Sequence, residues 1–198
     1  MSNIAAKFFK YRSYTPIPFI ILMLVFENSN PISLVTGFLI AVFGELIRFW
    51  GVSWAGSETR TTDGVGGSNL IISGPFAYVR NPLYVGNILM YSGLGVMSFA
   101  LFPYLQIVAI AFFVLQYHLI VGEEEAFLKT KFGEHYNRFL ENVPRFFPRF
   151  TPYKDEKNIQ PKVSYAKGFK SEIRTLQAFT VVIILILVKW YLRVNNIL

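Results

Sequence analysis

The sequence contains no cysteine and only two histidines, His118 and His135, which stand apart from each other. The lack of cysteine excludes disulfides, thiolate nucleophiles and cysteine-ligated metals. No further histidine or carboxylate follows either histidine at regular ligand spacing, so the sequence predicts no metal site.

Charged residues are also scarce. They make up 16% of the 198 residues, against 53% apolar residues, and the mean hydropathy is positive, at +0.41. This composition is typical of a membrane protein. The net charge is +7, but the basic residues flank apolar runs instead of forming one stripe among exposed aromatics. The charge therefore indicates membrane topology, and we expect no nucleic-acid partner.

Five apolar runs predict an all-α fold: a polytopic integral membrane bundle of about five transmembrane helices, with residues 1–198 as a single membrane domain. The runs cover residues 15–26, 32–56, 83–100, 101–121 and 175–192. The first run is short, because 12 residues rise only about 18 Å against a hydrocarbon core of roughly 30 Å. This run either recruits flanking residues to complete a span or does not fully cross the bilayer.

Basic residues predict the orientation of the bundle. Residues 122–174 contain eleven Lys or Arg, residues 57–82 contain Arg60 and Arg80, and the amino-terminal flank contains three more. The two remaining connections contain none. The positive-inside rule thus puts the amino terminus and both long connections on the cytoplasmic side. Lys189 and Arg193, near the opposite end, argue against this scheme.

Two features lie inside the apolar runs. Glu45 and Arg48 are three residues apart, hence on one helix face, and either pair with each other or take a substrate or cofactor role. The glycines in "GLG", residues 93–95, favour close helix packing over nucleotide binding.

An acidic run, Glu123 to Glu125, follows the fourth apolar run. Carboxylates are unfavourable at a helix carboxyl end unless a cation or a hydrogen-bond donor is near. They either form a solvated helix end or accept hydrogen bonds from hydroxyls or a cationic ligand.

The stretch "GPFAYVRNPLYVGN", residues 74–87, breaks the helix between two apolar runs. Proline biases Asn81 towards an extended backbone, so this turn can direct side chains or amides at a ligand. The candidates for a polar cluster are Tyr78, Arg80, Tyr84 and Arg145. Interfacial anchoring is the alternative role for such residues.

Together, "RNPLYVG" and "EEAFLKTKFGEHYNRFLENVPRFFP" resemble the isoprenylcysteine carboxyl methyltransferase family and its relatives among phospholipid methyltransferases. The likeness covers residues 44–150 as a methyltransferase-like core. Residues 151–174 then form a basic connector, and residues 175–192 an additional transmembrane helix, which either completes a substrate groove or makes an oligomer contact.

The resemblance implies an S-adenosylmethionine-dependent methyltransferase with its cofactor at the cytoplasmic face and a lipophilic acceptor from the bilayer. That acceptor is an isoprenylcysteine-like carboxylate, or a lipid amine or thiol. The implied cofactor-binding residues are Ser68, Asn69, Leu70, Ile71, Phe76, Asn81, Pro82, Leu83, Tyr84 and Glu124. The implied catalytic residues are Arg80, Glu125 and Arg145, with Glu125 and Arg145 shaping the acceptor site and Glu125 as the base for an ammonium acceptor.

Two positions depart from the family pattern. Asn81 replaces a histidine, and asparagine does not titrate near neutrality, so any acid–base role there is lost. Ile120 replaces an arginine four residues before the glutamate pair, which puts an anionic acceptor in doubt.

Two alternatives stay open. One is an NADPH-dependent membrane reductase of the sterol type, although two carboxylates suit ribose hydroxyls better than a 2′-phosphate. The other is a membrane scaffold that has kept the fold without catalysis.

Overall fold

A computed structural model describes residues 3–56, 69–155 and 160–197, and Ser68 therefore lies outside the described residues. Within these ranges the chain forms helices and no strand, which confirms the all-α prediction. The helices are α1 (Asn3–Tyr11), α2 (Ile17–Val25), α3 (Pro31–Ala55), the 3-10 helix η2 (Gly74–Ala77), α4 (Pro82–Ser98), α5 (Tyr104–Phe132), α6 (Glu134–Asn142) and α7 (Tyr165–Val194).

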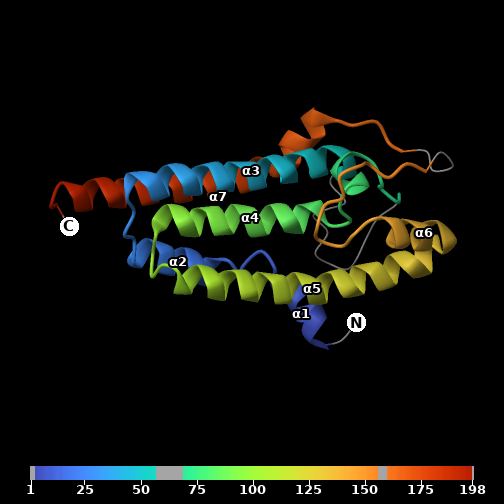
Figure 1. The fold of residues 1–198 in the computed structure, drawn as a ribbon, viewed down its shortest axis with the longest axis horizontal. Helices are drawn as coiled ribbons and strands as arrows, with labels where there is room; N and C mark the ends of the chain where they lie inside the picture. Colours follow the sequence, from blue (N-terminus) through green and yellow to red (C-terminus); the bar gives the residue numbers. More distant parts are fainter. Residues whose placement is uncertain (1–2, 57–68, 156–159, 198) are drawn as a thin grey trace.

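The long helices α3, α4, α5 and α7 lie side by side and alternate in direction (Figure 1). The short α2 lies beside α4 and α7, whereas α1 crosses α5. The α3–α4 and α5–α7 connections, which carry the motifs, meet at one end of the bundle, and the short links before α3 and before α5 lie at the other. The antiparallel order of the helices thus brings the two distant motifs together.

Among the described residues, three helices are long and apolar enough to cross a membrane: α3, α5 and α7. The helix α4 has 17 residues and rises about 26 Å, and α2 has nine residues and rises about 14 Å. Exposed apolar side chains cover the outward faces of the long helices, as expected where lipid is the solvent.

Two helices extend beyond their apolar runs. The helix α5 continues through the acidic run to Phe132. The helix α7 begins at Tyr165, because the side chain of Ser164 accepts a hydrogen bond from the Lys167 amide and caps the first turn. The last ten residues of the expected connector, 165–174, are therefore helical.

Glycines allow α3 and α4 to pack with their backbones in contact. A Cβ on Gly44 would lie 2.5 Å from the Met90 nitrogen and 2.6 Å from the Gly86 oxygen. A Cβ on Gly93 would clash with Ala41 in the same way. This close approach confirms the packing role predicted for Gly93.

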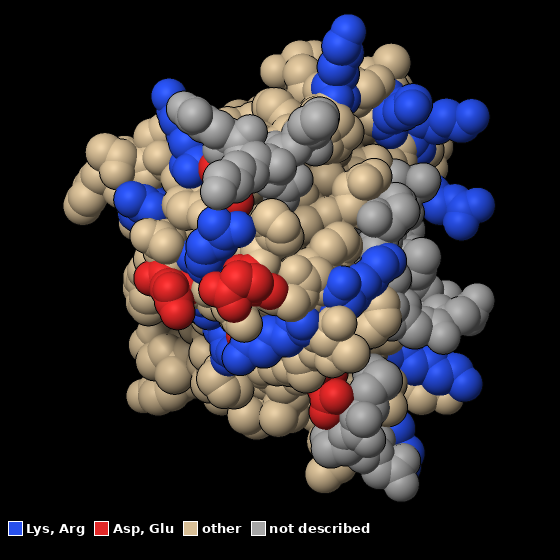
Figure 2. Space-filling model, turned by 90° about the vertical axis from the view of Figure 1, so that its right-hand side faces the viewer, with Lys and Arg blue, Asp and Glu red and all other residues tan. Residues whose placement is uncertain are grey.

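Charged side chains occur at both ends of the bundle. Figure 2 looks onto the end that carries the motif connections and shows Lys and Arg side chains spread around its rim. At the opposite end, the buried Glu27 accepts hydrogen bonds from Arg193 Nε (3.2 Å) and Nη2 (3.4 Å). Arg193, which argued against the predicted orientation, therefore has a carboxylate partner within the fold.

Candidate functional site

Main-chain hydrogen bonds join the turn before α4 to the segment after α6. The Arg80 amide donates to the Pro144 oxygen, the Arg149 amide to the Tyr78 oxygen and the Tyr153 amide to the Ala77 oxygen, each at 2.9 Å. The Asn81 side chain adds a bond from Nδ2 to the Arg145 oxygen (3.2 Å). Two motifs far apart in the sequence thus form one rigid unit.

Glu125 lies buried beneath this unit, between two arginines. Arg80 Nε lies 3.1 Å from Glu125 Oε1, and Arg145 donates from Nε to the same oxygen (3.2 Å) and from Nη2 to Oε2. Arg80 also donates to the Leu140 oxygen (2.7 Å). Both carboxylate oxygens accept from guanidinium groups, so Glu125 ties α5 to the turn.

Glu124, one residue earlier, faces a different side chain. Its Oε1 accepts a hydrogen bond from the Tyr84 hydroxyl (2.7 Å), and the Tyr84 ring stacks on Tyr117 at 4.7 Å between centroids. Successive residues of a helix point about 100° apart, so Glu125 meets the two arginines while Glu124 meets Tyr84.

The two motifs and α7 enclose a cavity of about 810 Å³, within the roughly 300–1,000 Å³ usual for small-molecule sites. Nine predicted cofactor residues line it: Asn69, Leu70, Ile71, Phe76, Asn81, Pro82, Leu83, Tyr84 and Glu124. Arg80 and Glu125 also line it, whereas Arg145 stands behind Glu125. The structure therefore brings together every predicted site residue that it describes.

Tyr136, from α6, also lines the cavity and is almost fully buried. Burial raises the pKa of its phenol, and the negative charge of Glu125 raises it further. The hydroxyl therefore stays neutral and can donate a hydrogen bond.

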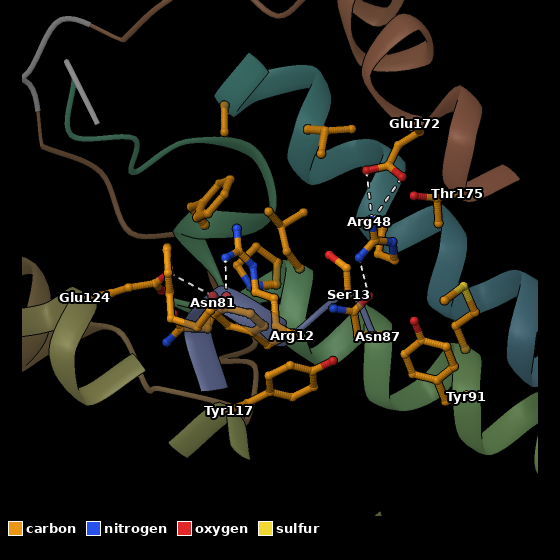
Figure 3. A pocket seen from close by; sticks show the side chains of 18 of the residues that line it. Arg12, Ser13, Arg48, Asn81, Asn87, Tyr91, Tyr117, Glu124, Glu172 and Thr175 are labelled. Carbon is orange, nitrogen blue, oxygen red and sulfur yellow. Dashed lines mark hydrogen bonds and ion pairs between the residues drawn. The ribbon is translucent and has the colours of Figure 1, made fainter. Parts of the chain in front are cut away.

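A second polar cluster lies at the other end of the cavity (Figure 3). Arg48 donates from Nε to Glu45 (3.2 Å), from Nη2 to both oxygens of Glu172 (3.0 Å each) and from Nη1 to Asn87. The expected Glu45–Arg48 pair exists, and it is part of a network that links α3, α4 and α7. Arg48 also lines the cavity, so a ligand role is compatible with the pairing.

The comparisons with known proteins agree with this geometry. A family model described as phospholipid methyltransferase matches residues 32–135, just over half of the chain. The chain belongs to the phospholipid methyltransferase family. This membership confirms the predicted relation to membrane methyltransferases.

Two curated relatives of this family member carry names from metal resistance. The "Cobalt-zinc-cadmium resistance protein CzcN" of Cupriavidus metallidurans is 30% identical over 147 residues, 71% of this chain and 63% of the relative. The "Nickel-cobalt-cadmium resistance protein NccN" of Alcaligenes xylosoxydans xylosoxydans is 33% identical over 89 residues, 45% of this chain and 40% of the relative. The matched part thus spans less than two thirds of each relative. No solved structure matches the chain.

The region matched by the phospholipid methyltransferase model contains α3, η2, α4 and α5 but neither α2 nor α7. The cavity residues that these flanks supply were not predicted from the sequence. They are Phe9, Arg12, Ser13, Pro16, Ile17 and Ile20 before α3, and Glu172, Arg174, Thr175, Ala178, Phe179 and Val182 on α7. One feature of the sequence could have indicated such a residue: Glu172 is a charge that lies just before an apolar run.

Proposed function

We propose that this chain is an integral membrane methyltransferase that uses S-adenosylmethionine to methylate a lipophilic acceptor, with its motif loops in the cytoplasm. The observation that carries the proposal is the convergence of nine cofactor-type residues from two distant motifs on one cavity. Membership of the phospholipid methyltransferase family supports methyl transfer over the reductase and scaffold alternatives.

The residues at the motif end of the cavity suit an adenosyl cofactor. Glu124 offers a carboxylate to the ribose hydroxyls, and Tyr84 holds that carboxylate in position. Phe76, Leu128 and Phe139 provide apolar and aromatic surface for an adenine ring.

The cofactor, when bound, supplies a methyl group that its sulfonium already activates, so the protein has to orient the acceptor and exclude water. The stacked rings of Tyr84 and Tyr117 both line the cavity and can serve both tasks. A proton-accepting role for Glu125, as an ammonium acceptor would need, stays a prediction, and its pairing with two arginines opposes it.

The opposite end of the cavity suits the apolar part of an acceptor. Ile17, Ile20, Leu94, Phe179 and Val182 line it, on helices whose outer faces expose apolar side chains. This supports a lipophilic acceptor that enters from the bilayer. Of the two roles left open for the carboxyl-terminal helix, completion of the groove is the one that this lining favours.

The names of the two relatives suggest a role in resistance to metal cations. Among the described residues no group of three His, Cys, Asp or Glu side chains could hold a metal ion. We therefore propose that any such role acts through methylation of a membrane component.

Calorimetric titration of the detergent-purified protein with S-adenosylmethionine tests the proposal. Replacing Glu124 with Gln removes a charge-assisted hydrogen bond of about 1.5–3 kcal/mol, so we expect affinity to fall about ten- to a hundredfold. Glu123→Gln is the matched control, since the neighbouring Glu123 does not line the cavity. Equal affinity in Glu124→Gln and the parent protein would refute the assignment of Glu124. A parent protein that binds no S-adenosylmethionine would refute the proposed function.

A further inference from the structure

The cavity is bordered by exposed side chains where α2 and α7 face each other. Five of its lining residues are exposed: Ser13, Ile17, Asn69, Arg174 and Ala178. Asn69 belongs to the motif end, whereas the other four come from α7 and from the start of α2 with the link before it. Neither helix belongs to the region that the family model matches. The motifs of the family therefore do not supply this opening between α2 and α7.

Further along their length the same two helices are in contact. Met23, Val182 and Ile186 belong to one buried apolar cluster, and Ile20 and Phe179 pack against it. Beyond this cluster, an ion pair joins the segment after α2 to the last turn of α7. The opening is thus closed on the side away from the motifs, and its borders are held by packing and by charge.

The borders of the opening change from polar to apolar along the bundle. Arg174 directly precedes the apolar run 175–192, whose residues rise about 27 Å, close to the thickness of a hydrocarbon core. Arg174 therefore lies at the level of lipid headgroups. Ala178 follows one turn deeper on the same face of α7, and on the other border the polar Ser13 precedes the apolar Ile17. This order is the polarity of a lipid molecule, with its headgroup first and its chains below.

Four arginines line the cavity: Arg12, Arg48, Arg80 and Arg174. Groups of the protein hold the first three, a main-chain oxygen in one case and buried carboxylates in the other two. Arg174 is exposed and makes no hydrogen bond or ion pair with any residue that the structure describes. Its planar fork can bind a phosphate through two parallel hydrogen bonds without breaking an existing pair.

We propose that the opening between α2 and α7 is a binding site for an anionic bilayer lipid. Arg174 binds the phosphate of the headgroup, and one chain lies between Ile17 and Ala178 and points into the cavity. The site goes beyond the proposed function, because lipid binding there requires neither the cofactor nor methyl transfer.

Three probes separate the headgroup from the chains. Dioleoyl phosphatidylglycerol carries both an anionic phosphate and chains, dioleoylglycerol carries the same chains without phosphate, and glycerol phosphate carries the phosphate without chains. The dissociation constant of each is measured by native mass spectrometry of the detergent-purified protein in a titration.

Two pairs of variants test the two parts of the site. Arg174→Gln and Arg174→Lys test the headgroup contact, with Lys170→Gln as control, since Lys170 is exposed one turn earlier on the same face of α7 and outside the cavity. Ala178→Phe fills the opening, and Val181→Phe is its control, since Val181 is exposed and does not line the cavity.

We expect Arg174→Gln to lose about three- to tenfold affinity for phosphatidylglycerol, as for a charged hydrogen bond that solvent partly screens. Its affinity for dioleoylglycerol should not change. Arg174→Lys should recover part of the loss, and Lys170→Gln should match the parent. Ala178→Phe should weaken the binding of both lipids, whereas Val181→Phe should weaken neither.

Equal loss in Arg174→Gln and Lys170→Gln would overturn the proposal, because it would show diffuse attraction to a basic surface. Unchanged phosphatidylglycerol binding in Arg174→Gln or in Ala178→Phe would overturn it too, as would glycerol phosphate binding as tightly as the lipid. A protein that binds the lipids as expected but no S-adenosylmethionine would refute the proposed function and leave this site standing.

Discussion

The ion pairs between α3 and α7 predict that the loss of Arg48 destabilises the protein more than the loss of Glu172. Among the described residues, Arg48 is the cation that contacts both Glu45 and Glu172. The side chains of Arg48 and Glu172 are 12% and 1% exposed, so solvent screens their interaction little.

Replacing Glu172 with Gln leaves Arg48 compensated by Glu45, so the loss is that of charged hydrogen bonds, about 1.5–3 kcal/mol. Replacing Arg48 with Met leaves both carboxylates buried without their cation, which costs about 3–5 kcal/mol. The two effects should not add, because the residues share one interaction. In the double variant the second substitution should therefore cost less than it does alone.

The free energy of unfolding can be measured in mixed micelles by raising the fraction of SDS. Lys170→Gln is the control, because Lys170 is exposed on the same helix. We expect the order of stability to be parent and control, then Glu172→Gln, then Arg48→Met. If Arg48→Met were no less stable than Glu172→Gln, or if the two effects added fully, the network would not act as described.

Three further predictions concern other parts of the bundle. Burial alone would raise the pKa of Glu27, but hydrogen bonds from its arginine and serine partners lower it below 4.5, so parent stability should fall below about pH 4.5 and Glu27→Gln should show a smaller fall. Gly44→Ala should cost about 1–3 kcal/mol in SDS unfolding, whereas Gly122→Ala, with nothing within 4 Å, should be neutral or stabilising. Ala178→Phe should reduce methyl incorporation into a membrane lipid extract at unchanged cofactor affinity, and Val181→Phe, which is outside the cavity, should not.

The helical bundle was predictable because lipid imposes long apolar runs that the sequence displays directly. The bounds of α7 were not, since charged residues interrupt its first ten residues, and its start is set by the cap at Ser164. Whether the short α2 and α4 cross a membrane depends on tilt and on neighbouring helices, which apolar length alone does not specify.

The motif end of the cavity was predictable because its residues occur in short, specific patterns around Asn81 and Glu124. The division of labour between Glu124 and Glu125 was not, since it depends on which face of α5 meets the arginines. Arg12 and Glu172 could not be found from spacing, because contacts between residues so distant in sequence depend on how the helices pack.

The hydrogen bonds between residues 77–80 and 144–153 have a consequence for evolution. They run between main-chain atoms, which every residue except proline can supply in full. Side chains in the turn can therefore change while these main-chain hydrogen bonds remain. A lineage with this frame can alter cavity side chains one at a time without rebuilding the junction of the two motifs.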